Sequence, residues 1–339
     1  MSYPSTPLRR TALLATMAAA VNLGGLVCVG AALAEPAIKD HASVDGERTV
    51  NRRIVAVGDI HGAFNGVRTI LREAALIDEH DHWAGGDAIL VQTGDFLDRG
   101  PGAIQAARLL MKLQQQAPAS GGDVVVLLGN HEILNLIGDL RDVTEAILEE
   151  LVDRHSAKRL EVSCNEYVAF QRQLALNKDR RPPKRRELRD KCFAEQRLGQ
   201  GEYLQEIGPT GEIGRWIRSL PSVVRIGGVV FVHGGISPAM ASWSLEQINA
   251  EVRSEIHSFD HAREHLLDRG LILPTSSMIE ILTAARDLQQ ADAEVQRFTP
   301  PEILQLLEID EWQMIRDDGP LWFRGYARWD EEEGRELMP

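Results

Sequence analysis

The sequence predicts an α/β fold built on a parallel β-sheet. Three continuous apolar runs, at 54–57, 88–92 and 124–128, are typical of strands that are buried on both faces. Helical apolar patterns separate these runs, at 67–75 and 104–113. The order strand, helix, strand, helix, strand implies parallel pairing with right-handed crossovers.

A β-hairpin is predicted in the second half of the chain. Two apolar runs within 223–232 flank Gly227-Gly228, a two-residue signal for a tight turn. A helical, charged segment precedes the hairpin at about 133–219, and a second helical segment follows it at about 245–288. We interpret both segments as insertions or caps over the carboxyl ends of the strands.

The composition is that of a soluble globular protein. The chain has 339 residues, of which 44% are hydrophobic and 26% are charged, and this length is ample for a sizeable core. The formal net charge of -13 argues against a surface that binds nucleic acid, because phosphate backbones require a basic footprint.

The N-terminus has the pattern of a targeting segment. Arg9 and Arg10 precede an apolar run at 11–33, and Ala32-Leu33-Ala34 forms a small-x-small cleavage site. We therefore expect residues 1–34 to be a removable signal peptide of the Sec or twin-arginine type, and the protein to be periplasmic or secreted, with no membrane span after processing. A single membrane anchor is the alternative.

Two cysteines remain beyond this segment, Cys164 and Cys192. In an oxidising compartment they could form a disulfide that closes a local loop. Two buried or free thiols are the alternative, and the sequence leaves both interpretations open.

A basic run extends over about 172–191 in an otherwise acidic chain. These cations could steer anionic substrates toward a cleft. A solvated helix pair whose charges are screened is the alternative, which the weakness of exposed charge effects favours.

Each predicted strand ends at a residue that can bind a metal ion. Asp59 and His61 follow the first strand, Asp95 the second and Asn130 the third, and His233 follows the hairpin. Ligands collect at the carboxyl ends of parallel strands because the loops there converge on one crevice. Each motif alone is more often a turn or a loop, but their joint occurrence in order after strands favours a metal site.

These residue types suit hydrolysis of a phosphate ester. Two cations about 3.5–4 Å apart acidify a bridging water and clamp the phosphoryl oxygens, and a carboxylate must hold the cations that close. Asp95 is the expected bridge, with Asp59 and His61 on the first metal and Asn130 and His233 on the second. Mixed oxygen and nitrogen ligands suit Mn, Fe or Zn better than Ca.

The motifs resemble those of a known family. Gly58-Asp59-Ile60-His61-Gly62, the run 94–100, Gly129-Asn130-His131-Glu132 and His233-Gly234-Gly235 resemble the signature of calcineurin-like metallophosphoesterases, in the branch of phosphoprotein phosphatases. The segment 319–325 is similar to a motif of bacterial Shewanella-like protein phosphatases. The resemblance implies a metallophosphoesterase-type β-sandwich flanked by helices, over a domain at 50–339.

The resemblance also implies catalytic roles. Asp98 and His131 correspond to a dyad in which the carboxylate orients an imidazole that protonates the leaving oxygen. Arg99 and Asn130 correspond to phosphate-binding residues, and Arg324 is a second candidate clamp because guanidinium groups bind phosphate through two hydrogen bonds. A surface arginine is the alternative for Arg324.

One element of the family pattern is absent from the sequence. The resemblance implies a further histidine ligand after the segment 319–325, whereas the last histidine here is His265. His257, His261 and His265 have helical spacing and are out of order for that role, so a solvated helix face is expected. We therefore expect a truncated C-terminus and an incomplete shell around the second metal.

Three functions follow from these observations. The first is a binuclear, manganese-dependent phosphatase that hydrolyses phosphomonoesters, with phosphoproteins carrying phosphoserine, phosphothreonine or phosphotyrosine as expected substrates, by attack of a metal-activated water with His131 as the general acid. The second keeps this chemistry for small phosphorylated metabolites or nucleotides. The third is a degenerate phosphatase that binds phosphorylated ligands without turnover.

Overall fold

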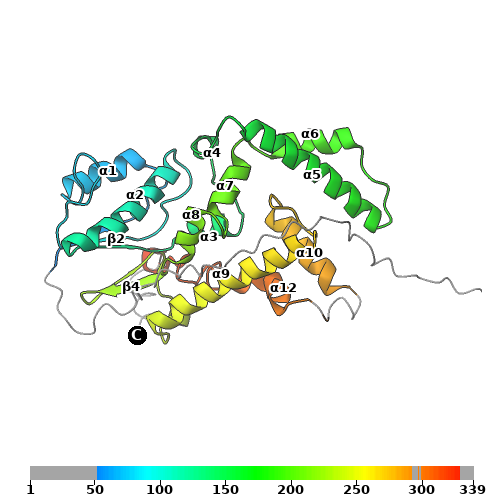
Figure 1. Cartoon of the computed structure of the whole chain (residues 1–339). Helices are drawn as coiled ribbons and strands as arrows, with labels where there is room; N and C mark the ends of the chain where they lie inside the picture. Colours follow the sequence, from blue (N-terminus) through cyan, green and yellow to red (C-terminus); the bar gives the residue numbers. More distant parts are fainter. Residues whose placement is uncertain (1–51, 292–296, 298, 329–339) are drawn as a thin grey trace, which may run out of the picture. The chain divides into compact units, whose positions relative to one another are not determined.

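The computed structural model describes residues 52–291, 297 and 299–328 (Figure 1). The predicted signal peptide and the chain end after Arg328 lie outside the described residues.

The strands are β1 Ile54–Val57, β2 Ile89–Gln92, β3 Asp123–Val126, β4 Val223–Ile226 and β5 Val229–Val232. The helices of the first half are α1 Phe64–Glu73, α2 Ala103–Gln116, η2 Ala117–Ser120, α3 Asn130–Leu136 and α4 Glu145–Glu149. Those that follow are α5 Ser156–Asn177, α6 Arg185–Glu195, α7 Gln200–Ile207, α8 Glu212–Arg218, η3 Pro238–Met240, α9 Leu245–Asp268, α10 Met278–Gln289, α12 Pro301–Gln305, η4 Leu306–Glu311 and α13 Gly325–Arg328.

The predicted parallel sheet is confirmed. The strand order is β1-β2-β3, and both pairs are parallel. The register pairs Val57 with Gln92, and Gln92 with Val126, so the three strands end level with one another. The loops that leave these ends therefore begin at one edge of the sheet.

The predicted hairpin is also present, and it forms a second layer. β4 and β5 pair antiparallel, and both turn glycines have positive φ, 56° for Gly227 and 83° for Gly228. This backbone is the tight turn whose twist matches the flanking strands, and glycine adopts it without steric cost. Val224 and Ile226 of the hairpin pack against Val91 and Val125 of the parallel sheet.

The opposite face of the parallel sheet is covered by helices. Side chains alternate along a strand, so Leu90 and Val124 point away from the hairpin. They belong to the main apolar core, together with Leu110 and Leu113 of α2. The fold is thus an α/β arrangement of two small sheets flanked by helices, in agreement with the sequence analysis.

The segment between β3 and β4 is helical, and α5 and α6 run side by side in it (Figure 1). Cys164 of α5 and Cys192 of α6 form a disulfide, with their Cα atoms 5.6 Å apart. Both are buried in a small apolar cluster with Tyr167, Val168 and Leu188. The structure therefore decides between the two interpretations that the sequence left open.

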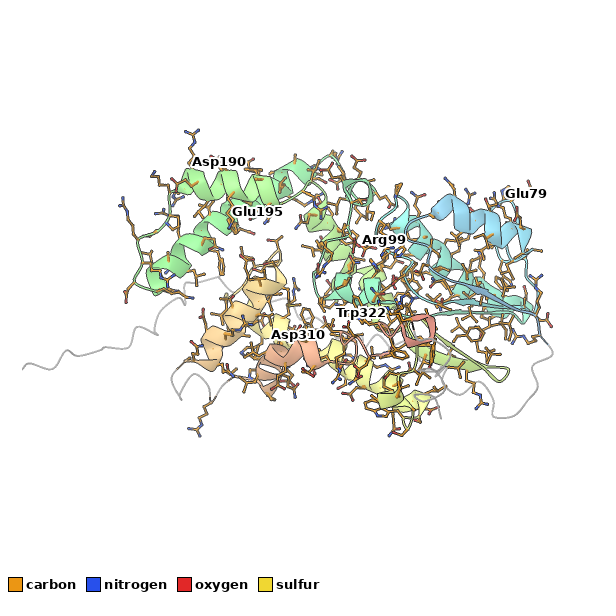
Figure 2. The ribbon with its side chains drawn as sticks, turned by 180° about the vertical axis from the view of Figure 1, so that it is seen from behind. Glu79, Arg99, Asp190, Glu195, Asp310 and Trp322 are labelled. Atoms are coloured by element: carbon orange, nitrogen blue, oxygen red, sulfur yellow. A yellow bond between two sulfur atoms is a disulfide. The ribbon has the colours of Figure 1, made fainter. Side chains whose placement is uncertain are left out.

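The basic run covers the end of α5, the loop after it and the first part of α6, and several of its charges on α6 are paired locally. Arg186 contacts Asp190 at 3.7 Å, and Lys191 contacts Glu195 at 3.8 Å; Figure 2 shows both acidic residues along this helix. Arg189 reaches across to α5, where it contacts Glu161. These pairs support the interpretation of a solvated helix pair.

Among the described residues, no helix combines the length and the apolar character that crossing a membrane requires.

Candidate metal centre

The loops after the parallel strands are joined to one another at their first residues. Asp59 lies two residues after β1, and Asp95 lies three residues after β2. The carbonyl oxygen of Asp95 accepts hydrogen bonds from the backbone nitrogens of Ile60 and His61, at 2.9 and 3.0 Å. The third loop begins α3 at Asn130. The level strand ends and these bonds bring the three motifs to one place.

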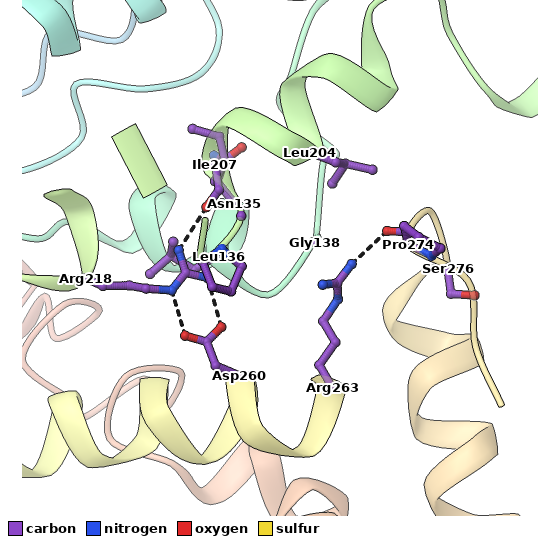
Figure 3. A pocket seen from close by; sticks show the side chains of 12 residues that line it. Asn135, Leu136, Gly138, Leu204, Ile207, Arg218, Asp260, Arg263, Pro274 and Ser276 are labelled. Atoms are coloured by element: carbon purple, nitrogen blue, oxygen red, sulfur yellow. Dashed lines mark hydrogen bonds and ion pairs between the residues drawn. The ribbon is translucent and has the colours of Figure 1, made fainter. Parts of the chain in front are cut away.

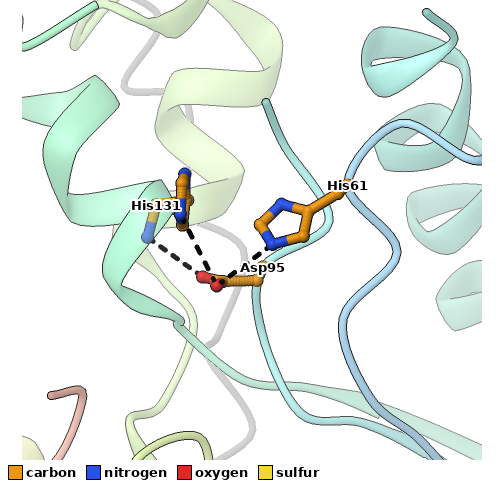
Figure 4. A group of neighbouring side chains, drawn as sticks. All are labelled: His61, Asp95 and His131. Carbon is orange, nitrogen blue, oxygen red and sulfur yellow. Dashed lines mark hydrogen bonds and ion pairs between the residues drawn. The ribbon is translucent and has the colours of Figure 1, made fainter. Parts of the chain in front are cut away.

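Asp95 lies at the centre of this site, and its side chain is almost fully buried, with 3% of the residue exposed. Its Oδ2 atom lies 3.6 Å from Nε2 of His61, 3.3 Å from Nε2 of His233 and 3.9 Å from Nε2 of His131. Figure 4 shows His61 and His131 on the two sides of this carboxylate. One carboxylate is therefore shared by three imidazoles, as a bridging ligand would be.

The other two predicted ligands complete the group. Asn130 Oδ1 lies 3.0 Å from Nε2 of His233. Asp59 lies 3.8 Å from His61 and 3.9 Å from His233. The structure thus brings together all five residues predicted to bind metal. It places Asp59 between the two histidines, whereas the sequence analysis assigned it to the side of His61 alone.

The histidines are oriented by backbone carbonyl groups. Nδ1 of His61 contacts the carbonyl oxygen of Leu97 at 3.0 Å, and Nδ1 of His233 contacts that of Thr93 at 3.0 Å. An imidazole that donates its Nδ1 proton presents a lone pair at Nε2, the arrangement usual for metal-binding histidines. In both residues Nε2 is the atom directed at Asp95.

The donor set fits a divalent cation. Among the residues that the structure describes, the buried Nε2 atom of His61 has no hydrogen-bond partner, although buried polar atoms are nearly always paired. Two groups with ligand atoms within 4.8 Å of one another share Asp95; they are His61, Asp95 and His131, and Asp59, Asp95 and His233. Asp95 belongs to both groups, as a carboxylate shared by two divalent ions would, whereas His131 of the first group is held by Asp98.

The pKa values of His233 and Asp95 are both shifted by the contact between these two residues. Burial lowers the pKa of His233, but its contact with Asp95 and the charge of that carboxylate raise it above the ordinary value. Conversely, burial raises the pKa of Asp95, but the contact and charge of His233 and those of His131 together outweigh burial, so the pKa of Asp95 is lowered. A positive charge is therefore favoured beside Asp95, whether a proton or a metal ion carries it.

The loops hold an unfavourable backbone conformation at this site. His61, Asp95, Asp98 and Arg99 all have positive φ, between 45° and 68°. Each such residue costs about 1–3 kcal/mol and persists only where its surroundings fix it. Gly129 is required for a different reason, since a Cβ atom there would lie 2.2 Å from Oδ1 of Asp95.

Glu132 fixes these loops, and the sequence analysis gave it no role. It is fully buried at 0% exposure, and its carboxylate accepts hydrogen bonds from four backbone nitrogens. The donors are Asp95 at 2.7 Å, Gly129 at 2.9 Å, Phe96 at 3.0 Å and Leu97 at 3.1 Å. Burial and the charge of Asp95 raise the pKa of Glu132 to about 7, against the effect of these bonds. The signal in the sequence is the glutamate three residues after Gly129, which is a helix capping pattern.

The predicted dyad is in contact. Nδ1 of His131 lies 2.8 Å from Oδ2 of Asp98, which is 1% exposed. Burial lowers the pKa of His131, but the Asp98 hydrogen bond and the charges of Asp95 and Asp98 outweigh it, so the pKa is raised. Asp142, which the sequence analysis did not select, lies 3.9 Å from the same imidazole.

Both candidate phosphate-binding arginines lie at the site. Nη2 of Arg99 is 3.0 Å from Nε2 of His131, and Nη2 of Arg324 is 3.4 Å from Nε2 of His233. The segment that carries Arg324 is attached to the hairpin loop, because the carbonyl oxygen of Pro320 accepts hydrogen bonds from Gly234 and Gly235. This attachment, rather than spacing along the chain, places Arg324 beside the metal ligands.

The three histidines of α9 have other surroundings. His261 contacts Glu302 of α12 at 3.5 Å, and the side chain of His261 is 57% exposed. His257 is exposed as well. These two positions agree with the expected solvated face, whereas His265 is half-buried and its Nε2 atom is buried, so the expectation was wrong for that residue.

The chain matches a known protein family and several curated relatives. The sequence profile of the calcineurin-like phosphoesterases matches residues 52–275. The chain is 34% identical over 224 residues to Shewanella-like protein phosphatase 2 of Arabidopsis thaliana, covering 62% of this chain and 53% of the relative. It is 29% identical over 208 residues to Shewanella-like protein phosphatase 1 of Plasmodium berghei, covering 61% of this chain and 46% of the relative.

A solved structure, the cold-active protein-tyrosine phosphatase of a psychrophilic Shewanella species, aligns with a TM-score of 0.49 and 24% identity, covering 84% of this chain and 61% of that one. The chain spans about half the length of the curated relatives that it matches. Because the profile covers most of the described residues and all five predicted metal ligands, the chain belongs to the calcineurin-like phosphoesterase family.

Proposed function

We propose that this protein is a binuclear metal-dependent phosphatase that hydrolyses phosphomonoesters, with phosphoproteins as its substrates. One observation carries the proposal: the buried Asp95 carboxylate is shared by His61 and His233, and the Asp98–His131 dyad lies beside it. When bound, two divalent ions would acidify water and offset the charge of the phosphoryl group. We propose manganese as the metal, among the ions that this donor set suits.

His131 is the proposed general acid. Its Nδ1 atom is held by Asp98, so Nε2 is the atom that can give a proton to the leaving oxygen. In the present state Nη2 of Arg99 donates to that same Nε2 atom. Arg99 must therefore leave His131 before the imidazole can act, and a phosphoryl group that binds the guanidinium supplies the reason for it to move. Once Arg99 has moved, Nε2 can take up a proton from water, which the raised pKa of His131 favours, and can then give that proton to the leaving oxygen.

Arg324 is the proposed second clamp on the phosphoryl group. It approaches the site from the side of His233, whereas Arg99 approaches from the side of His131. Two guanidinium groups that lie beside different histidines can bind different oxygens of one phosphoryl group and hold it in a single orientation.

The substrate class rests on the relatives. Two of them are named protein phosphatases, in Arabidopsis and Plasmodium. A second candidate substrate class is the dinucleoside polyphosphates, because 81 residues are 33% identical to a symmetrical bis(5'-nucleosyl)-tetraphosphatase of Buchnera aphidicola, over 24% of this chain.

A substrate panel tests the proposal. The purified, manganese-loaded protein is assayed with p-nitrophenyl phosphate, with phosphoserine, phosphothreonine and phosphotyrosine peptides, and with a dinucleoside tetraphosphate. The proposal expects metal-dependent hydrolysis of the first two groups, with phosphopeptides preferred. Preference for the dinucleotide would favour the second candidate, and binding of phosphopeptides without hydrolysis by any metal form would indicate a degenerate phosphatase.

We also propose that the protein is exported. The basic and apolar pattern within residues 9–34 supports this, and so does the disulfide between Cys164 and Cys192, because such bonds persist in oxidising compartments. Cell fractionation with the intact chain and with a chain lacking residues 1–34 tests the proposal. Equal cytoplasmic retention of both would contradict it.

A further inference from the structure

A second concentration of charge lies outside the metal centre, around Arg263 of α9 (Figure 3). It lines a cavity of about 20 Å³, enough for one atom of the size of a water oxygen. The walls come from the end of α3, from α7 and α8, from α9 and from the segment 274–276. The charged residues of this lining are Arg218, Asp260 and Arg263.

The carboxylate in this cavity is fully engaged by Arg218. Nε and Nη2 of Arg218 bind the two oxygens of Asp260, at 2.6 and 2.8 Å. Nη1 of the same guanidinium donates to the carbonyl oxygens of Ile207 and Gly214, both at 2.9 Å. Arg218 and Asp260 thus form a closed, two-bonded ion pair.

Arg263 has no such partner. Within the part of the chain that the structure describes, its guanidinium donates one hydrogen bond, from Nη2 to the carbonyl oxygen of Pro274 at 2.7 Å. Burial lowers its pKa; Asp260 acts to raise the pKa, and Arg218 lowers it again. Asp260 is taken up by the ion pair with Arg218, so among the described residues that line the small cavity no second carboxylate is available to the half-buried Arg263. An anion that binds there would balance this charge.

Arg263 is also open to a larger space. A cleft of about 480 Å³ lies between α5, α7 and the segment 273–275, and Arg263 lines it too. The two spaces also share Leu204, Gly208, Pro209 and Pro274. A ligand in the cleft can therefore reach the guanidinium while one of its oxygens enters the small cavity.

We propose that Arg263 anchors a second oxyanion-binding site, which takes the carboxylate or phosphate group of a ligand whose remainder lies in the larger cleft. The free edge of a guanidinium presents fixed, paired donors that match such oxygens. The site lies at the end of α3 opposite Asn130, since Asn135 of this helix lines the cavity. The proposal does not depend on the proposed phosphatase function.

Titration calorimetry of the metal-loaded protein with inorganic phosphate tests the proposal. We expect two binding events, one at the metal centre and one at Arg263. Arg263→Met keeps the apolar stem and removes the charge, so it should weaken one event at least about tenfold, the range for a lost hydrogen bond to a charged group. Arg269→Met is the matched control, because Arg269 ends the same helix and is exposed; it should keep both events.

Two results of the titration would contradict the proposal. Arg263→Met with both events unchanged would overturn the proposal, and so would a wild-type protein with a single event that this variant retains. Unchanged hydrolysis of p-nitrophenyl phosphate by Arg263→Met would show that the lost event is not at the metal centre. If Arg263→Met does not fold, Arg263→Lys decides, because one ammonium group cannot replace the paired donors and should bind phosphate several-fold more weakly. Acetate in place of phosphate then tells whether a carboxylate suffices.

Discussion

Oε2 of Glu132 accepts a hydrogen bond from the backbone nitrogen of Asp95 at 2.7 Å, and this contact fixes the loop that carries the shared metal ligand. The same carboxylate binds the backbone nitrogens of Phe96, Leu97 and Gly129. A single side chain therefore joins the loop after β2 to the start of α3. The positive φ of Asp95 depends on such a fixed environment.

Replacing Glu132 should destabilise the protein strongly. Glu132→Ala leaves four buried N–H groups without acceptors, so we expect the free energy of unfolding to fall by at least about 3 kcal/mol, since each unpaired group costs about 1–3 kcal/mol. Urea unfolding followed by circular dichroism measures the change. Glu246→Ala, at an exposed glutamate of α9, is the control. A change below about 0.5 kcal/mol for Glu132→Ala, the range of ordinary surface substitutions, would contradict the role.

Removing Asp95 should remove both metal ions, because both candidate groups include it. We expect Asp95→Asn to lose most bound metal and His233→Asn to lose about half, by elemental analysis of dialysed protein. His257→Asn replaces an exposed histidine of α9 and should keep the wild-type content. Full metal content in Asp95→Asn would exclude a bridging role.

Removing His131 should lower turnover while metal content stays unchanged. His131→Asn should cost about 10²–10⁴-fold in kcat, the usual range for a lost general acid. The loss should be larger for an alkyl phosphate than for p-nitrophenyl phosphate, because the nitrophenolate leaves without a proton. Asp98→Asn should also lower the rates with both substrates, because Asp98 holds the imidazole of His131. Equal losses with the two substrates, or a parallel loss of metal, would show that His131 acts otherwise.

Glu255 should make stability depend on pH. Its carboxylate accepts hydrogen bonds from the backbone nitrogens of Gln313 and Met314, at 2.6 and 2.8 Å. Burial raises the pKa of Glu255 to about 7, from its ordinary value of 4.5. The folded state therefore holds this proton more tightly than the unfolded state. The contribution is fully present below pH 4.5, and it is lost as the pH rises to about 7.

The expected decrease in the free energy of unfolding is about 3 kcal/mol across this window. It is measured as the difference between the wild type and Glu255→Gln, in urea unfolding at several pH values. The variant cannot ionise at this position, so its curve should lack this decrease. Parallel curves for the two proteins would contradict the raised pKa.

The sequence by itself determined the strands, the hairpin and the choice of the five candidate metal ligands. Each of these features depends on neighbours within a few residues. A buried strand requires a continuous apolar run, and the tight turn at Gly227-Gly228 requires positive φ. Because parallel strands end at one edge, the predicted strand order also implied that Asp59, Asp95 and Asn130 would meet.

Tertiary structure alone decided the contacts between distant segments. Glu132 accepts bonds from residues about 36 positions earlier, and Arg324 reaches His233 from 91 positions later. The Cys164–Cys192 pair and the contact of Arg263 with the carbonyl oxygen of Pro274 likewise depend on which elements pack together. Patterns of neighbouring residues do not predict such contacts. The partner of a side chain depends on how whole helices and strands pack, and on which buried polar groups lack a hydrogen-bond partner.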